Sequence, residues 1–192
     1  MERIYLDHAA TAPLHPEVLQ EMLPFLQEHY GNPSSIHQFG RKARAAVDES
    51  REKISNSLKV KPQTLIFTSG GTEANNLAIS GFALEHQDNG KHIITSEVEH
   101  HAVLNACQEL EQRGFDVTYL PVDQTGCVAP EQVKRALRDD TILVTIMYGN
   151  NEVGTIQLLR NWPRSFKRTR LCFIRMRFRH LERLSLILNS SV

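Results

Sequence analysis

The sequence predicts an α/β fold in which a mainly parallel sheet is flanked by helices. From residue 64 onward, short apolar segments alternate with longer helical ones, and this alternation is typical of parallel sheets. The run 141–147 is almost continuously apolar, as expected of a strand that is buried on both faces. The chain has 192 residues, of which 41% are hydrophobic and 23% charged, so it is long enough to bury such a core.

The first third of the chain is predicted to be helical. Apolar residues recur at helical spacing over 16–29, which begins with a proline, and Pro24 would kink or break this helix. Residues 31–35 (GNPSS) have the composition of a loop. Residues 37–58 are rich in alanine and charge, which predicts an amphipathic helix with a wide solvated face.

Strands and helices are then expected in turn. We predict strands at 64–68, 92–95, 117–120 and 141–147, and helices at 73–85, 100–112 and 130–138.

Two strand ends could bind a ligand. Residues 69–72 (SGGT) lie between a strand and a helix, where glycines admit a ligand and helix N–H groups favour an anion; a plain crossover turn is the alternative. His100 follows the strand 92–95 and could stack on a flat ring or relay protons, or have only a structural role. Its neighbour His101 faces another way on a helix, so the pair is a poor metal clamp.

A third candidate is Asn150-Asn151, which follows the most apolar strand. Side-chain amides at such a strand end can donate to an oxyanion or a carboxylate, and an ordinary turn is the alternative. The segment 7–13 (DHAATAP) is uninformative by itself.

Cysteine usage and hydropathy point to a protein of the cytoplasm. Cys107, Cys127 and Cys172 lack C-x-x-C spacing, which argues against a disulfide framework and against a zinc site, so no metal is expected. No run of eighteen apolar residues occurs, so no membrane association is expected.

Taken in order, these segments resemble the class V aminotransferase family, and its NifS/IscS-type cysteine desulfurases are the nearest match. The resemblance covers residues 1–157 and implies an incomplete large domain of a fold-type I transferase that uses pyridoxal 5'-phosphate. The motifs that carry it are 5–11 (YLDHAAT), 31–35 (GNPSS), 67–73 (FTSGGTE), 99–100 (EH) and 150–154 (NNEVG).

The resemblance also implies roles for individual residues. Gly71 and Thr72 would hold the phosphate of pyridoxal 5'-phosphate. His100 would stack on the pyridoxal ring and move protons as the catalytic residue, and Asn151 would lie beside the phenolic oxygen of the ring and the substrate carboxylate. The family reaction converts L-cysteine to L-alanine and leaves the sulfur as a persulfide on an enzyme cysteine.

Members of this family are homodimers that pass the sulfur to acceptor proteins, for iron–sulfur cluster assembly or tRNA thiolation. Another class V enzyme, such as a selenocysteine lyase, is the alternative within the family.

Two groups that the family reaction needs have no match in these 192 residues. Lys167 lies outside any pattern of the kind that carries the Schiff-base lysine, and Cys107 and Cys127 lie in the wrong part of the fold to accept sulfur. Without the lysine the cofactor cannot be attached covalently. We therefore expect the chain by itself to be inactive.

Residues 158–192 differ sharply from the rest of the chain in charge. Up to Gln157 there are 13 basic and 21 acidic residues, whereas the remainder has nine basic residues and one acid. A non-catalytic protein with a basic tail that binds nucleic acid is one explanation. We favour a shifted reading frame, because one added base can turn codons 158–163 into Pro-Ile-Ala-Glu-Leu-Ala. The same shift can turn codons 172–183 into a stretch with His-Thr-Asp-Ala, the family's cofactor aspartate in its context.

The nucleotide sequence across codons 155–192 tests the frameshift. We expect the neighbouring frame to encode Pro-Ile-Ala-Glu and then His-Thr-Asp-Ala. A neighbouring frame that encodes neither segment would contradict it.

Overall fold

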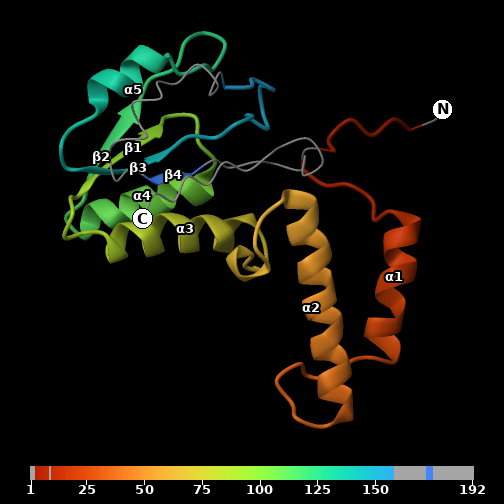
Figure 1. The fold of residues 1–192 in the computed structure, drawn as a ribbon. Helices are drawn as coiled ribbons and strands as arrows, with labels where there is room; N and C mark the ends of the chain where they lie inside the picture. The colour runs from red at the N-terminus through yellow and green to blue at the C-terminus, as the bar shows by residue number, and fades with distance from the viewer. Residues whose placement is uncertain (1–2, 9, 158–171, 175–192) are drawn as a thin grey trace. The chain divides into compact units, whose positions relative to one another are not determined.

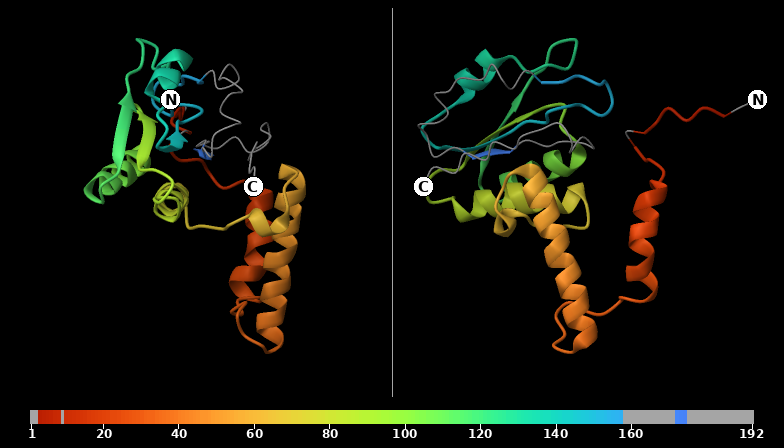
Figure 2. Two further views of the ribbon diagram at one scale, coloured as in Figure 1. Left: turned by 60° about the vertical axis from the view of Figure 1, so that its left-hand side comes forward. Right: turned by 45° about the vertical axis from the view of Figure 1, so that its right-hand side comes forward.

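The computed structural model describes residues 3–8, 10–157 and 172–174 of the chain. These residues form two compact units, one that ends at Phe67 and one that begins at Thr68 (Figures 1 and 2). Of the predicted frameshifted segment 158–192, only the backbone of 172–174 belongs to the described residues.

The first unit consists of two long helices and one short one. They are α1 (Pro16–Gln27), α2 (Gln38–Leu58) and the 3-10 helix η1 (Pro62–Thr64). Figure 1 shows α1 and α2 side by side and running in opposite directions. Pro24 does not break α1, which continues for three residues beyond it.

A histidine begins each of these two long helices. The Nδ1 atom of His15 accepts the Glu17 N–H at 3.3 Å, and Nδ1 of His37 accepts the Gly40 N–H at 3.4 Å. Gly40 also lies directly against the loop 31–35. A Cβ at this position would collide with the carbonyl oxygen of Ser35, so the close approach requires glycine. The GNPSS loop therefore folds directly onto the start of α2.

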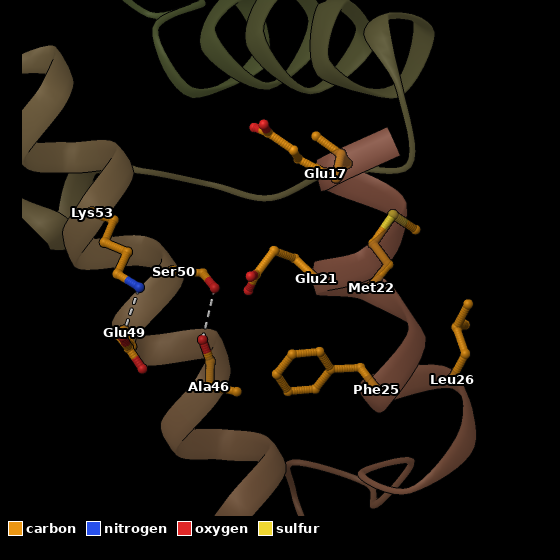
Figure 3. Close-up of a pocket in the computed structure, with 10 residues that line it drawn as sticks. Glu17, Glu21, Met22, Phe25, Leu26, Ala46, Glu49, Ser50 and Lys53 are labelled. Atoms are coloured by element: carbon orange, nitrogen blue, oxygen red, sulfur yellow. Dashed lines mark hydrogen bonds and ion pairs between the residues drawn. The ribbon is translucent and has the colours of Figure 1, made fainter. Parts of the chain in front are cut away.

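A groove lies between α1 and α2 (Figure 3). Glu21 and Phe25 point across it toward α2, where Ala46 and Lys53 line the opposite wall. None of the site residues predicted from the sequence lines this groove.

The predicted strand at 64–68 is wrong. Residues 62–64 form η1, and no regular structure follows up to Thr68. Ile66 is 67% exposed and Phe67 is 47% exposed, and no described strand pairs with them. Because a strand needs a neighbour to take its hydrogen bonds, the apolar pattern alone does not produce one here. Arg51 holds the segment instead, with its guanidinium 4.7 Å from the Phe67 ring centroid.

The second unit confirms the predicted parallel sheet with flanking helices. The strand order is β2-β1-β3-β4, and every neighbouring pair is parallel. In Figure 1, α3 and α4 cover one face of the sheet and α5 covers the other. The elements are α3 (Gly71–Glu85), β1 (His92–Ser96), α4 (His101–Gln112), β2 (Asp116–Leu120), α5 (Pro130–Ala136), β3 (Thr141–Thr145) and β4 (Cys172–Ile174).

Apolar side chains fill both faces of this sheet. Ile93 packs with Val103 of α4 on one face, while Ile94 packs with Val133 of α5 on the other. All five residues of β1 and all five of β3 are buried, as predicted for a strand covered on both sides. Within the described ranges, none of the helices has both the length and the apolar character needed to cross a bilayer.

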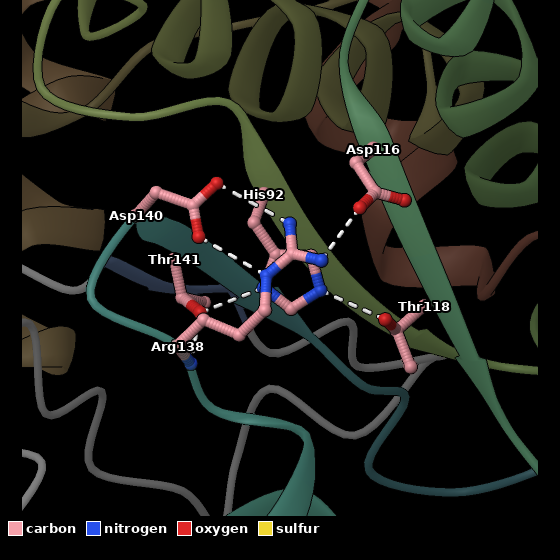
Figure 4. A network of polar contacts seen from close by, with 6 residues as sticks. All are labelled: His92, Asp116, Thr118, Arg138, Asp140 and Thr141. Carbon is pink, nitrogen blue, oxygen red and sulfur yellow. Dashed lines mark hydrogen bonds and ion pairs between the residues drawn. The ribbon is translucent and has the colours of Figure 1, made fainter.

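A buried histidine organises the edge of the sheet where the strands begin (Figure 4). His92, the first residue of β1, is fully buried, and its Nδ1 and Nε2 atoms lie 2.7 Å and 2.8 Å from the hydroxyl oxygens of Thr141 and Thr118. Arg138 bridges the same edge, since it binds Asp116 at 2.6 Å and Asp140 at 3.0 Å. One imidazole therefore links β1 to both neighbouring strands.

Acidification is expected to weaken the fold through His92. Burial lowers the pKa of His92, the positive charge of Arg138 lowers it further, and Asp140 and Asp116 only partly offset this. As pH falls below about 6.5, the unfolded chain therefore binds a proton that folded His92 resists, and the free energy of unfolding decreases. Urea unfolding at several pH values should show that the free energy of unfolding decreases less on acidification in His92→Gln than in the parent.

His101→Gln is the matched control, because it removes an exposed histidine from the same unit. The explanation would be wrong if His92→Gln and the parent lost the same stability over this pH range.

Candidate functional site

The topology brings three chain segments to the edge of the sheet where the strands end. The helix α4 begins directly after β1, and the loop 146–157 follows β3 at the same edge. The helix α3 ends at Glu85, shortly before β1 begins, so its C-terminus lies near the opposite edge. The 15 residues of α3 span about 22 Å, and a five-residue strand spans about 17 Å. The helix is therefore long enough to reach from one edge of the sheet to the other, which brings Gly71 to the edge where the strands end.

The start of α3 is open and has no side-chain cap. Gly70 is the N-cap residue, and Gly71 and Thr72 are exposed. A Cβ at Gly70 or Gly71 would meet no atom within 4 Å. The first N–H groups of a helix have no partner within the helix, and together with the helix dipole they favour an anion. The geometry therefore fits the predicted phosphate site at Gly71 and Thr72.

Glu73 shapes the approach to this helix. Its Oε2 atom accepts hydrogen bonds from the Ser69 N–H at 2.6 Å and from the Ser69 hydroxyl at 2.7 Å. These bonds lower the pKa of the carboxyl and fix the turn 69–73. The turn is thus held from one side by Glu73, while the backbone at Gly70 and Gly71 faces open space.

His100 is the N-cap residue of α4. Its Nδ1 atom accepts the Ala102 N–H at 3.1 Å. An accepting Nδ1 atom has no proton, so the neutral ring carries its proton on Nε2. His100 is half-buried and His101 is exposed, so the two adjacent histidines have different surroundings.

The two predicted asparagines have different roles. The Oδ1 atom of Asn150 accepts the N–H groups of Glu152 and Val153 at 2.8 Å and 3.0 Å, and Nδ2 donates to the Val98 carbonyl at 3.2 Å. Asn150 therefore folds its own loop and ties it to the turn after β1. Asn151 is exposed, and its assignment to ligand binding stays a prediction.

Sequence reasoning missed Glu99, which is the most buried carboxyl group at this edge. Glu99 is 6% exposed, and its Oε1 atom accepts the Ser96 hydroxyl at 2.7 Å and the Met147 N–H at 2.8 Å. Burial raises its pKa to about 7, and the two hydrogen bonds only partly oppose this. Its neighbour Glu97 is exposed. The motif 99–100 includes Glu99, but the local sequence pattern does not show that its carboxyl is the buried one.

The structure therefore joins two of the three predicted parts directly. The turn that carries His100 and the loop that carries Asn151 are linked by the Glu99 bond to Met147 and by the Asn150 bond to Val98. Gly71 and Thr72 share the same edge because of the direction of α3.

The cysteine nearest these residues in the core is closed to solvent. Cys107 of α4 is fully buried, and burial, with the nearby charges of Glu99 and Glu111, raises the pKa of its thiol to about 12. Its thiol stays protonated at neutral pH and is not a nucleophile there.

Replacing Glu99 with glutamine is expected to change stability in a pH-dependent way. Because its pKa rises from 4.5 to about 7, folded Glu99 holds a proton that the unfolded chain has lost between these values. As pH rises through this range, the contribution of Glu99 to the free energy of unfolding should therefore fall by up to about 3 kcal/mol, and Glu99→Gln should lack this contribution.

Urea unfolding at about pH 5 and about pH 8 measures the difference. Glu97→Gln is the matched control, because it removes an exposed carboxyl from the same turn. Equal pH dependence in Glu99→Gln and the parent would show that the carboxyl is not buried as described.

Known proteins are similar to this chain in sequence and in fold. A protein of Bacillus subtilis (strain 168) named "Putative cysteine desulfurase IscS 1" is 62% identical over 157 residues, which are 82% of this chain and 41% of that protein. A "Cysteine desulfurase IscS" of Methanosarcina thermophila is 48% identical over 170 residues, 88% of this chain and 42% of its own. The chain thus spans about two fifths of the length of these relatives.

Solved structures agree with the sequence relatives. A NifS-like protein matches with a TM-score of 0.87 at 38% identity, over 92% of this chain and 49% of its own. The structure titled "SspA in complex with cysteine" matches with a TM-score of 0.82 at 40% identity, over 89% of this chain and 49% of its own. The fold described above is therefore part of the NifS-like fold. Since the aminotransferase class-V family matches residues 4–174, this chain belongs to that family.

Proposed function

We propose that this chain is the cofactor-binding first part of a cysteine desulfurase, a transferase that takes sulfur from L-cysteine and releases L-alanine. The observation that carries the proposal is the open start of α3, which the direction of that helix brings toward the sheet edge of His100 and Asn151. Relatives named cysteine desulfurase, at up to 62% identity, support this particular reaction. A similar structure titled as a complex with cysteine supports the substrate.

The residues present fit pyridoxal 5'-phosphate. Gly70 and Gly71 leave space in front of a helix N-terminus, which suits a phosphate, and the Thr72 hydroxyl adds a donor. His100 and Asn151 offer a flat ring and an amide, which suit an aromatic ring with a phenolic oxygen. When bound, pyridoxal 5'-phosphate acts as an electron sink for the bonds at the substrate α-carbon.

The chain's own residues would bind and orient. The N–H groups of Gly71 and Thr72 would hold the phosphate end of the cofactor. His100 has its proton on Nε2 when Nδ1 caps α4, so Nε2 is the atom that would donate or return a proton. The Asn151 amide would orient the substrate carboxylate.

These 192 residues by themselves would bind the phosphate and the ring without completing the reaction. They contain no counterpart of the lysine and the sulfur-accepting cysteine that the family reaction implies. The buried thiol of Cys107 does not substitute for the missing cysteine, because it is protonated and closed to solvent.

A chimera tests the proposal. Residues 1–157 would replace the matched 157 residues of the Bacillus subtilis relative, and alanine formed from L-cysteine would be measured. We expect the chimera to form alanine, the 192-residue chain to form none, and His100→Ala in the chimera to be slower by about 100-fold or more, as for a lost proton-transfer group. Thr72→Ala should mainly weaken binding of pyridoxal 5'-phosphate.

His101→Ala is the matched control, because it removes the exposed neighbouring histidine. A folded chimera that binds pyridoxal 5'-phosphate and forms no alanine would contradict the assigned reaction.

A further inference from the structure

A buried carboxyl stands directly behind the candidate site. Glu99 lies between Ser96, the last residue of β1, and His100, the N-cap residue of α4. It accepts one hydrogen bond from its own turn, from the Ser96 hydroxyl, and one from the Met147 N–H, 48 residues away in sequence. One oxygen atom thus joins the ends of two neighbouring parallel strands.

The two joined segments are the ones that carry His100 and Asn151, the residues proposed to bind the ring. Met147 begins the turn that leads to Asn150 and Asn151, and Glu99 immediately precedes His100. The Asn150 bond to Val98 is a second link between the same segments. A movement of Glu99 would therefore shift His100 and Asn151 relative to each other.

The other carboxyl oxygen is buried without a use in the fold. Oε2 of Glu99 is inaccessible and has no hydrogen-bond partner among the described residues. A buried polar atom without a partner is unfavourable, so Oε2 adds nothing to the stability of the link between the strands. Natural proteins tolerate such an unfavourable group where a functional site requires it.

We propose that Glu99 is a positioning residue of the candidate site: it fixes the His100 turn against the Asn151 loop, so that both meet the same ligand ring. This inference rests on the proposed function for the identity of the ligand, while the link between the two segments rests on the geometry alone. The phosphate end of the candidate site is independent of this link, because Gly71 and Thr72 belong to α3, whereas the Glu99 carboxyl accepts its hydrogen bonds from Ser96 and Met147.

Amide hydrogen exchange on the 192-residue chain without ligand tests the link. Glu99→Ala removes the acceptor of the Met147 N–H, so exchange at Met147 and in the segments 97–101 and 147–151 should accelerate about tenfold or more. Glu99→Gln keeps an acceptor oxygen and should exchange like the parent. Glu97→Gln, on the same turn, is the control and should also match the parent.

The distribution of the effect decides the outcome. Acceleration confined to the two segments supports the link. Unchanged exchange in Glu99→Ala, or an equal acceleration in β2 and α5, would overturn it, because the latter result describes a general loss of stability.

Ligand binding by the same chain tests the positioning role. Dissociation constants would be measured for pyridoxal 5'-phosphate and for inorganic phosphate. Glu99→Ala should weaken binding of pyridoxal 5'-phosphate about tenfold, as expected when a supporting residue behind a site is lost, and leave inorganic phosphate unchanged. Glu99→Gln should restore most of the affinity.

An equal loss for both ligands, or no loss for either, would overturn the positioning role. If the parent chain binds neither ligand, the proposed function fails, and hydrogen exchange still decides whether Glu99 links the two segments.

Discussion

The parallel pairing of β1 with β2 and β3 determines where the other parts of the second unit lie. His92 pairs with Asp116 and Thr141 at one end, and Ser96 pairs with Leu120 at the other. Because all strands run the same way, every segment that leaves a strand starts at one edge, and every segment that enters a strand arrives at the other. The candidate site is therefore assembled by chain direction before any of its side chains makes a contact.

Burial of both faces has a second consequence, which concerns the strand ends. Apolar side chains from α3, α4 and α5 cover β1 and β3, so a polar group near either end of these strands must find its partners inside the protein. His92 does so fully, with one threonine hydroxyl at each ring nitrogen. Glu99 does so with only one of its two oxygens. At the edge where the strands begin, both ring nitrogens of His92 thus have hydrogen-bond partners. At the edge that carries the candidate site, one oxygen of Glu99 has none among the described residues.

How much could be predicted from the sequence depended on how local each feature is. The strands β1 to β3 and the helices that follow them have clear apolar patterns, and the Gly70-Gly71 turn is a local signal too. The segment 64–68 has an equally good strand pattern, but strand formation depends on a neighbouring strand, which the pattern does not report. The local pattern does not show which of Glu97 and Glu99 is buried, because the bonds that make Glu99 a buried acceptor come from Ser96 and from the distant Met147 N–H. Asn150 and Asn151 also differ because of a partner that is distant in sequence, since Asn150 donates a hydrogen bond to the Val98 carbonyl.

The two buried titratable groups in β1 and the turn that follows it have pKa values shifted in opposite directions. Burial disfavours the charged form of both, so His92 resists gaining a proton while Glu99 resists losing one. At neutral pH His92 is in its preferred neutral state. Ionisation of Glu99, whose pKa is raised by burial, would leave a buried charge with hydrogen bonds to only one of its two oxygens. Stability therefore explains a histidine at position 92, because a neutral ring satisfies two strands at once. The two hydrogen bonds to Oε1 do not by themselves require a glutamate at position 99, because an amide oxygen could accept the same two bonds. What distinguishes position 99 is its place between His100 and the loop of Asn151, so the reason for a buried acceptor oxygen there is best sought in the link between these two segments.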